Sequence, residues 1–246
     1  MKRSKLNPAT EATSSGSPSG ARFHDEVAAG WTAGYARSGF ARRLDLFRPI
    51  LTKHVRPGSS WVDLGCGSGV LSKELLALGA TVIGVDGSPR MLSHALEQMG
   101  SQYAGRVGWI QSDVQSIDRL KNGTFDGVLC SSVVEYLDRP DALLKEAARI
   151  LSPGGVLVIS LPSTFSAVRM LQKSIRALAS MFGKDMFSYL SVSRLEISPR
   201  AIDRLFQEAG FSVTRLTRFD PVLPRALLRA VRPALLVVEA RKVDRP

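Results

Sequence analysis

The sequence predicts an α/β protein built on a doubly wound, mostly parallel β-sheet. An apolar run at 61–64 leads into a turn that holds three glycines, Gly65, Gly67 and Gly69. A helix-like run follows, and a second apolar run, 82–85, ends at Asp86. A strand, a glycine-rich turn, a helix and a second strand with an acidic residue about 20 positions further on are the parts from which a parallel sheet builds a nucleoside pocket.

The remaining elements follow in an order typical of this fold. Residues 71–78 place apolar side chains at helical spacing and stop at Gly79, which predicts a helix packed on the sheet. The predicted elements after it are a strand and turn at 109–114, a strand at 125–130, a helix that begins at 133–136, and a strand at 151–160.

The ends of the chain complete the sheet. Residues 41–55 predict a helix that leads into the first strand. Near the C-terminus, Ser198 as a cap and Pro199 at the first helical position predict a helix that runs to Gly210. Two strands, 211–216 and 235–240, follow and are expected to lie antiparallel to each other.

The details of the glycine turn disfavour a dinucleotide. Val70 stands where a dinucleotide site has its third glycine, which lets the pyrophosphate approach the helix N-terminus. Asp63 lies two residues before the first glycine, and a carboxylate there repels phosphate but attracts an ammonium group. S-adenosylmethionine has an α-ammonium and a sulfonium and no phosphate, so it fits both features.

The run Asp-Leu-Gly-Cys-Gly-Ser-Gly at 63–69, together with Asp86, resembles the class I S-adenosylmethionine-dependent methyltransferases. The resemblance covers roughly residues 60–162, and it implies a Rossmann-like sheet, mostly parallel, with an antiparallel last strand. The aromatic spacing of residues 23–35 is similar to the small-molecule members of the ubiquinone-biosynthesis O-methyltransferase type. Those relatives carry Glu-His where this chain has Glu135-Tyr136.

The resemblance also implies a cofactor site. Asp86 would bind both ribose hydroxyls, Asp113 the adenine amino group, and the end of the strand at 125–130 would pass beneath the methionine moiety. The cofactor-binding residues expected in this way are Asp63, Gly65, Cys66, Gly67, Gly69, Asp86, Gly87, Ser88, Asp113, Val114, Ser131 and Tyr35.

Each of these residues has a structural alternative. Asp86 and Asp113 are also good helix N-caps, and Asp63 could make a purely structural hydrogen bond within its apolar run. Cys66 and Cys130 can serve as small buried hydrophobic side chains. Neither cysteine has a second Cys or His nearby at ligand spacing, so the sequence predicts no metal site.

Five segments are expected along the chain. Residues 1–20 are small and polar and are expected to be disordered. By the resemblance, the methyltransferase domain at 21–246 would comprise N-terminal lid helices at 21–56, the cofactor-binding core at 57–162, a helical insertion at 163–195 that covers the substrate, and the C-terminal part of the sheet at 196–246.

The candidate catalytic residues are His24 and Tyr136. A sulfonium methyl is already activated, so positioning of the acceptor can supply most of the rate, and a base is needed only for a protonated acceptor. His24 is the one histidine of three that the predicted lid places near a substrate, although a histidine on a helix surface is the alternative. Tyr136 departs from the His of the relatives and could hydrogen-bond the acceptor or the cofactor.

The net charge of +11 is unevenly distributed. Residues 1–60 carry +6 (10 basic, 4 acidic), residues 61–162 carry −3 (8 basic, 11 acidic) and residues 163–246 carry +8 (15 basic, 7 acidic). The basic flanks suggest an anionic partner, with an Arg-rich proteome as the alternative. Within 164–184, an apolar stripe and a face with Arg169, Lys173 and Arg176 suggest contact with an anionic membrane; alternatively the stripe packs on the sheet and the cations face solvent.

The sequence thus predicts methyl transfer from S-adenosylmethionine to a small, lipid-like or anionic molecule, at oxygen before nitrogen or carbon. With two cysteines and no apolar signal or membrane span, the protein is expected in the cytoplasm, with peripheral membrane contact; its oligomeric state stays open. RNA methylation is the alternative, but 131–135 lacks the Asn/Asp-Pro-Pro-aromatic run of nucleic acid enzymes that methylate amino groups. A binding protein without turnover is a third reading.

Overall fold

The computed structural model describes residue 25 and residues 38–164, 166–180, 197–223 and 225–243. They form one seven-stranded sheet in the order β3-β2-β1-β4-β5-β7-β6. The strands are β1 (Ser60–Leu64), β2 (Thr81–Asp86), β3 (Val107–Gln111), β4 (Phe125–Cys130), β5 (Leu151–Pro162), β6 (Phe211–Phe219) and β7 (Leu235–Lys242). The first five run parallel, and β7 is antiparallel to both of its neighbours. The predicted doubly wound sheet is confirmed, with both final strands longer than predicted.

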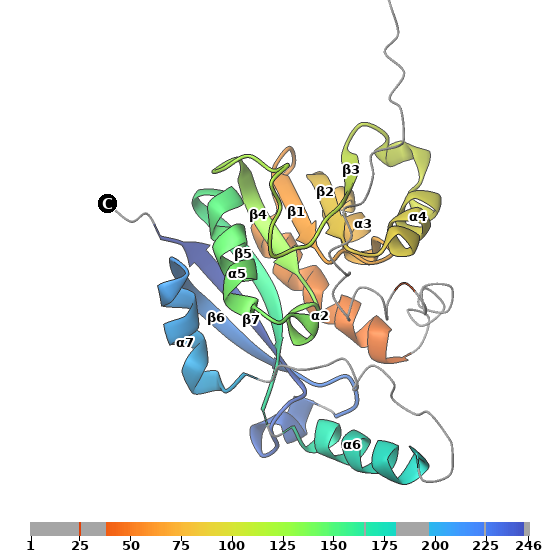
Figure 1. The fold of residues 1–246 in the computed structure, drawn as a ribbon, viewed down its shortest axis with the longest axis vertical. Helices are drawn as coiled ribbons and strands as arrows, with labels where there is room; N and C mark the ends of the chain where they lie inside the picture. Colours follow the sequence, from red (N-terminus) through yellow and green to blue (C-terminus); the bar gives the residue numbers. More distant parts are fainter. Residues whose placement is uncertain (1–24, 26–37, 165, 181–196, 224, 244–246) are drawn as a thin grey trace, which may run out of the picture.

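Helices cover the two faces of this sheet (Figure 1). They are α2 (Ser38–His54), α3 (Val70–Ala77), α4 (Pro89–Gln98), α5 (Pro140–Ile150), α6 (Ala167–Ser180) and α7 (Pro199–Glu208), with 3-10 turns η1 (Ser101–Tyr103), η2 (Val134–Tyr136) and η4 (Arg225–Arg229). Apolar side chains of α5 and α7 form one core layer with the sheet, and those of α2 and α3 form the other.

The side chains of β1 alternate between the two faces of the sheet, so this strand contributes to both core layers. Val62 and Leu64 belong to the core beneath α5 and α7, whereas Trp61 belongs to the core beneath α2 and α3. Successive side chains of a strand point to opposite faces, so Asp63 lies on the same face as Trp61, toward α3. The apolar run of the sequence is therefore a strand buried on both sides.

A buried carboxylate joins α2 to the sheet. Glu239 of β7 accepts hydrogen bonds from Lys53 Nζ at 2.8 Å, and its Oε2 lies 2.7 Å from His54 Nε2. Burial favours the neutral acid, but the hydrogen bonds from Lys53 and His54 outweigh it and lower the pKa of Glu239. The C-terminal end of α2 is thus fixed electrostatically as well as by apolar packing.

One prediction about the helices is wrong, and one is confirmed without the expected hydrogen bond. Residues 133–136 do not begin a helix: Val134–Tyr136 form a single 3-10 turn, and the next helix starts at Pro140. Leu137 adopts an extended backbone, which ends the turn, and proline fixes the first helical position of α5 instead. At the C-terminal helix, Ser198 is the N-cap residue, but its hydroxyl makes no capping hydrogen bond.

Helix α6 is confirmed at the predicted place, but the alternative in which its apolar stripe packs on the sheet is wrong. Figure 1 shows α6 beyond the end of β5, away from the two helix layers. The apolar side chains of Leu171 and Leu178 are 61% and 65% exposed, so the stripe does not pack on the sheet. Arg169 is only 6% exposed, so the predicted basic face is partly buried, because α6 turns that side toward the body of the protein. Lys173 is exposed and Arg176 is half-buried.

A close backbone approach explains Gly127 of β4. A Cβ at this position would overlap the indole ring of Trp61, which lies beside it on β1 and is almost completely buried. Glycine is the residue that lets a large ring lie flat against a neighbouring strand.

We therefore expect Gly127→Ala to lower the free energy of unfolding by about 1–3 kcal/mol, the usual cost of overpacking a core. Gly108→Ala is the matched control, because a Cβ there meets nothing within 4 Å. Urea unfolding of both variants tests the prediction, and equal stabilities of the two would contradict it.

Candidate functional site

The turn after β1 is held against the end of β2. Gly65 N and Cys66 N donate to Val85 O at 2.7 and 3.1 Å, and Gly67 N donates to Asp86 Oδ2 at 2.8 Å. Gly65, Gly67 and Gly69 have φ values of 69°, 53° and 77°, a conformation that glycine adopts at little cost. The predicted glycines thus shape a loop whose N–H groups donate to Val85 and Asp86, at the carboxyl end of β2.

The same loop contacts the end of β4. A Cβ at Gly65 would overlap the side chain of Val133, so the two chain segments touch directly. Cys66 is buried, as its alternative reading as a small hydrophobic side chain predicts. The ends of β1, β2 and β4 therefore form one continuous edge.

Asp86 lies at the end of β2, where the sequence places it. Its Oδ1 accepts a hydrogen bond from Ser88 N at 2.9 Å, while Oδ2 accepts the one from Gly67 N. Burial raises the pKa of Asp86, and these N–H donors partly offset the rise. The N-cap of α4 is Ser88, whose hydroxyl accepts from Met91 N, so the N-cap alternative for Asp86 is wrong.

Asp63 lies beneath the glycine loop and is 2% exposed. Its Oδ2 accepts a hydrogen bond of 2.6 Å from Ser72 Oγ of α3, which is the structural contact that the sequence left open. Burial raises the pKa of Asp63 to about 7, and the nearby Asp86 carboxylate adds to the rise. A nearby cation would favour the ionised form of this carboxylate.

Asp113 follows β3 and is exposed. Its Oδ1 accepts from Gln115 N at 2.9 Å, an Asx turn rather than a helix cap, because no helix begins there. Val114 is buried behind it. The carboxylate is therefore accessible at the same edge of the sheet as Asp86.

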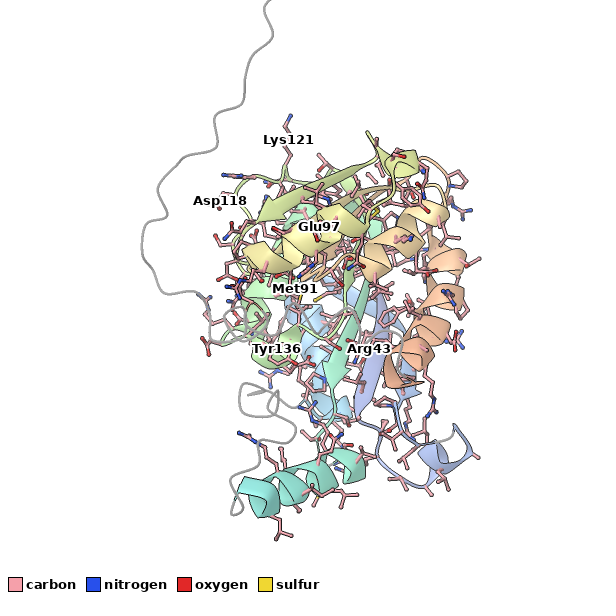
Figure 2. All side chains as sticks on the ribbon, turned by 90° about the vertical axis from the view of Figure 1, so that its right-hand side faces the viewer. Arg43, Met91, Glu97, Asp118, Lys121 and Tyr136 are labelled. Atoms are coloured by element: carbon pink, nitrogen blue, oxygen red, sulfur yellow. The ribbon has the colours of Figure 1, made fainter. Side chains whose placement is uncertain are left out.

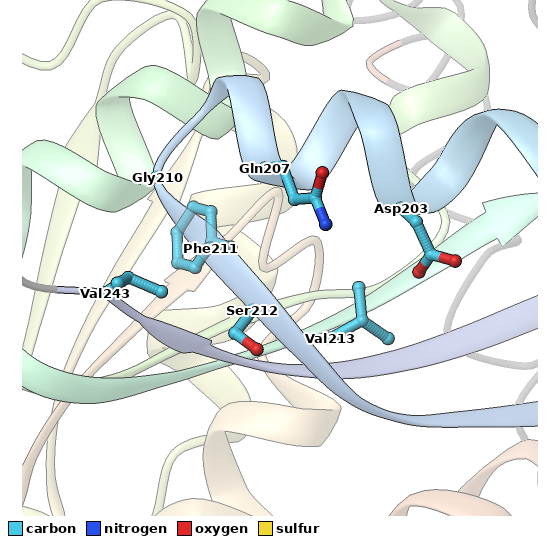
Figure 3. A pocket seen from close by; sticks show the side chains of 7 residues that line it. All are labelled: Asp203, Gln207, Gly210, Phe211, Ser212, Val213 and Val243. Atoms are coloured by element: carbon cyan, nitrogen blue, oxygen red, sulfur yellow. The ribbon is translucent and has the colours of Figure 1, made fainter.

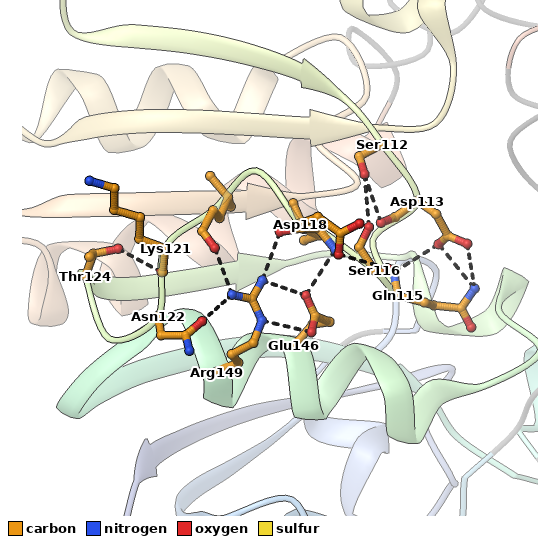
Figure 4. Close-up of polar contacts among 12 residues, drawn as sticks. Ser112, Asp113, Gln115, Ser116, Asp118, Lys121, Asn122, Thr124, Glu146 and Arg149 are labelled. Atoms are coloured by element: carbon orange, nitrogen blue, oxygen red, sulfur yellow. Dashed lines mark hydrogen bonds and ion pairs between the residues drawn. The ribbon is translucent and has the colours of Figure 1, made fainter. Parts of the chain in front are cut away.

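The loop that carries Asp113 is anchored by Arg149 of α5 (Figure 4). The guanidinium donates to the carbonyl oxygens of Leu120 and Ile117 at 2.8 and 2.9 Å and to Asn122 Oδ1 at 2.6 Å. It also pairs with Glu146, whose carboxylate accepts from Ile117 N. This network holds the β3–β4 connection, which has no regular structure of its own.

Polar groups gather at the end of β4. Ser131 Oγ, Ser132 Oγ and Glu135 Oε2 are buried, and no hydrogen-bond partner reaches them within the described part of the chain. Ser132 has φ 58°, the one positive φ of a described non-glycine residue, and its N–H donates to Ser160 Oγ. Tyr136 is also buried here. Glu135 is not among the residues predicted for the site, although a carboxylate inside the apolar run 133–137 is a signal of the same kind as Asp63.

The N-terminal segment reaches this edge at Asp25. Ser88 Oγ donates to Asp25 Oδ1 at 2.7 Å, and Arg90 N donates to the same oxygen at 3.1 Å. The hydrogen bond from Ser88 lowers the pKa of Asp25 despite some burial. His24, Tyr35 and the tail at 1–20 lie outside the described residues, so their predicted places stay predictions.

The pocket drawn in Figure 3 is a different feature. It is lined by Asp203 and Gln207 of α7 and by the start of β6. Phe211 pairs with Lys242, whose neighbour Arg241 pairs with Val156 in the first half of β5. This pocket therefore lies near the amino ends of the parallel strands and at the far edge of the sheet, away from the glycine loop.

The residues at the carboxyl edge fit S-adenosylmethionine. The backbone of the loop leaves room for a ligand to approach closely, and Asp63 and Asp86 supply carboxyl groups. Ser68 Oγ, Ser131 Oγ and Trp109 Nε1 are buried polar atoms without a partner among the described residues. Buried polar atoms of this kind require a partner that a polar ligand can provide. In the part of the chain that the structure describes, no three or more His, Cys, Asp or Glu side chains are grouped so that they could hold a metal ion. None of the described helices has both the length and the hydropathy that a membrane span requires.

Comparisons with known proteins agree with this geometry. Residues 62–159 match the family model described as "Methyltransferase domain". A ubiquinone biosynthesis O-methyltransferase of Xanthomonas oryzae pv. oryzae is 29% identical over 152 residues, which cover 58% of this chain and 63% of that relative, less than two thirds of its length.

Solved structures share the fold at low identity. A magnesium protoporphyrin IX methyltransferase from Synechocystis PCC 6803 with bound S-adenosylhomocysteine has a TM-score of 0.61 at 20% identity, with 83% of each chain covered. The [4+2]-cyclase SpnF has a TM-score of 0.68 at 16% identity, with 92% of this chain and 96% of that one covered. The sheet order, the glycine loop, Asp86 and the domain matched at residues 62–159 together support a class I S-adenosylmethionine-dependent methyltransferase.

Proposed function

We propose that the protein transfers a methyl group from S-adenosylmethionine to an oxygen atom of a small, lipid-like or anionic molecule. The observation that carries this proposal is the Asp86 carboxylate held by Gly67 N and Ser88 N beside the glycine loop. This arrangement leaves further lone pairs of a buried carboxylate available for the two ribose hydroxyls. The cofactor, when bound, supplies an activated methyl group on a positively charged sulfur.

The remaining cofactor contacts are assigned from the same edge. Asp113 and Val114 would receive the adenine, and Gly87 and Ser88 would border the ribose. Asp63 beneath the loop would attract the α-ammonium, and Ser131 would hydrogen-bond the methionine end. Cys66 and the three loop glycines would provide the floor. Together these residues fix the cofactor, so that catalysis depends on how the acceptor is positioned.

The N-terminal segment would close the site as a lid. Asp25 supports this proposal, because its bonds to Ser88 and Arg90 hold that segment at the N-terminus of α4, next to Asp86. Tyr35 would cover the cofactor from the same segment, and His24 and Tyr136 would face the acceptor. A closed lid excludes water from the reacting atoms.

The acceptor class rests on two supports. Relatives of this chain are named for ubiquinone biosynthesis, although the matched segment covers 63% of the first of them. The apolar side chains that α6 exposes also suit a lipid-like acceptor or a membrane surface. Peripheral contact with an anionic membrane is therefore part of the proposal.

Removal of the Asp86 carboxylate tests the cofactor site. Asp86→Ala is expected to weaken binding of S-adenosylhomocysteine by about 1.5–3 kcal/mol, the scale of a hydrogen bond to a charged group. Asp126→Ala is the matched control, because Asp126 Oδ2 also accepts a backbone hydrogen bond, from Ser60 N at 2.8 Å, but at the opposite end of the sheet. Calorimetry that finds equal affinities for the two variants would remove Asp86 from the site.

The pKa of Asp63 predicts a pH dependence of stability. Because the folded-state pKa is raised to about 7, Asp63 contributes stability below its unfolded pKa, and this contribution is lost as pH rises through about 7. Asp63→Asn should therefore gain stability relative to the unsubstituted protein between pH 5 and pH 8, by about 1–4 kcal/mol. Urea unfolding at both pH values measures the gain, and parallel pH profiles of the two proteins would refute it. Since an ammonium group favours the carboxylate, S-adenosylhomocysteine should stabilise Asp63→Asn less than the unsubstituted protein at pH 8.

Vesicle binding tests the exposed face of α6. A double variant, Leu171→Ser with Leu178→Ser, should bind anionic vesicles at least about tenfold more weakly, because each leucine loses apolar burial. Lys173→Gln should reduce only the preference for anionic over neutral lipid, by about 1 kcal/mol. Leu96→Ser is the control, since Leu96 of α4 is 65% exposed and lies on another surface. Co-sedimentation that is the same for all variants would exclude α6 as a membrane contact.

A further inference from the structure

Glu135 is a buried carboxylate that has no role among the proposed cofactor contacts. It lies in the turn η2, and its side chain is 6% exposed. Its Oε2 has no hydrogen-bond partner in the described part of the chain. An unsatisfied carboxylate oxygen in a dry site is costly, so it points to a ligand that donates a hydrogen bond there.

The surroundings of Glu135 are polar on several sides. Arg169 of α6 and Arg43 of α2 are the cations that act on it electrostatically, and the buried Cys130 thiol at the end of β4 is affected by its charge. The hydroxyls of Ser131 and Ser132, four and three residues before Glu135 in the chain, are buried without partners among the described residues. Figure 2 shows Arg43 and Tyr136, the neighbour of Glu135, at the same end of the sheet. Side chains from four elements thus converge on one polar site.

The position of this site relative to the glycine loop is fixed by packing. Val133 touches Gly65 at the start of the loop, and Glu135 follows two residues later. Asp86, the proposed ribose contact, holds the loop from its other side at Gly67. The loop therefore lies between the ribose side and Glu135, which places Glu135 on the side where the methyl group and the acceptor would meet.

We propose that Glu135 is the catalytic base and binds a hydroxyl-bearing acceptor through Oε2, an inference that rests on the proposed methyl transfer. The O–H bond of the acceptor breaks and its proton passes to Glu135. The oxygen lone pair forms the new bond to the methyl carbon as the sulfur–carbon bond breaks, and that electron pair stays on sulfur. The products are a methyl ether and a neutral thioether, and the protonated Glu135 releases its proton to water after product release.

The chemistry of the site suits this role. Burial raises the pKa of Glu135, while the charges of Arg169 and Arg43 favour its ionised form. A carboxylate with a raised pKa is a stronger base than an ordinary glutamate. Tyr136 is a hydrogen-bond donor at neutral pH, which suits the positioning of an acceptor better than the removal of its proton.

The first experiment uses labelled S-adenosylmethionine and a panel of small hydroxylated acids and phenols as probes. Glu135→Gln should lower kcat by about 10²- to 10⁴-fold, with unchanged affinity for S-adenosylhomocysteine by calorimetry. Glu135→Asp should recover part of the rate. The acidic limb of kcat/KM in the unsubstituted protein should lie above the ordinary glutamate pKa and vanish in Glu135→Gln. Glu208→Gln, on the exposed face of α7, is the control and should leave rate and profile unchanged.

His24→Ala separates the two candidate bases. If the acidic limb persists in Glu135→Gln and vanishes in His24→Ala, Glu135 is not the base. A full rate in Glu135→Gln overturns the proposal as well. If the unsubstituted protein binds no S-adenosylhomocysteine, the proposed function itself fails, and this inference fails with it.

The second experiment needs no turnover. Infrared difference spectra between the unsubstituted protein and Glu135→Gln should contain a protonated carboxyl band that titrates above the range of an ordinary glutamate. Addition of an accepted probe should shift this band, because the acceptor hydroxyl then bonds the carboxylate. A carboxyl band that titrates in the pH range of an ordinary glutamate, or a band that no probe shifts, would show that Glu135 has only a structural role.

Discussion

The hydrogen bond from Gly67 N to the Asp86 carboxylate is the interaction on which the rest of the site depends. It ties the loop after β1 to the end of β2, two parallel strands that end side by side. The loop can adopt this path because its three glycines take positive φ values. Once the loop is fixed there, Asp63 is sealed beneath it, and Val133 is pressed against Gly65. The same short turn therefore sets the positions of the proposed ribose and acceptor sides of the site.

Helix α6 exposes apolar side chains and buries one of its arginines. A helix on a protein surface normally buries its apolar side and exposes its charges. Helix α6 instead exposes Leu171 and Leu178 and buries Arg169, which acts on Glu135. The basic excess of the C-terminal segment is therefore only partly a surface feature. One of its arginines lies buried where it acts on Glu135, whereas the apolar stripe is exposed.

The fold by itself does not decide the chemistry. The same architecture occurs in a protoporphyrin methyltransferase and in a [4+2]-cyclase, at 20% and 16% identity. Buried polar atoms without a partner in the described part of the chain lie after the ends of β4 and β5. In this chain those places hold Ser131, Ser132, Glu135 and Thr164, with partnerless polar atoms among the described residues. The specific chemistry of the protein must be sought there.

The sequence by itself determined the succession of strands and helices in the parallel half, the glycine loop and the place of Asp86, because these depend on local patterns: apolar runs, glycines and a fixed interval. It did not determine the turn at Val134–Tyr136, the hydrogen bond between Asp63 and Ser72, or the orientation of α6. These depend on how the segments pack against one another in three dimensions. An amphipathic pattern indicates that a helix has two sides without indicating which side the protein covers. Glu135 shows the same limit of sequence-based prediction. Its charge is visible in the sequence, but only the tertiary structure shows that Glu135 is buried and that its Oε2 has no partner among the described residues, which makes it a candidate for chemistry.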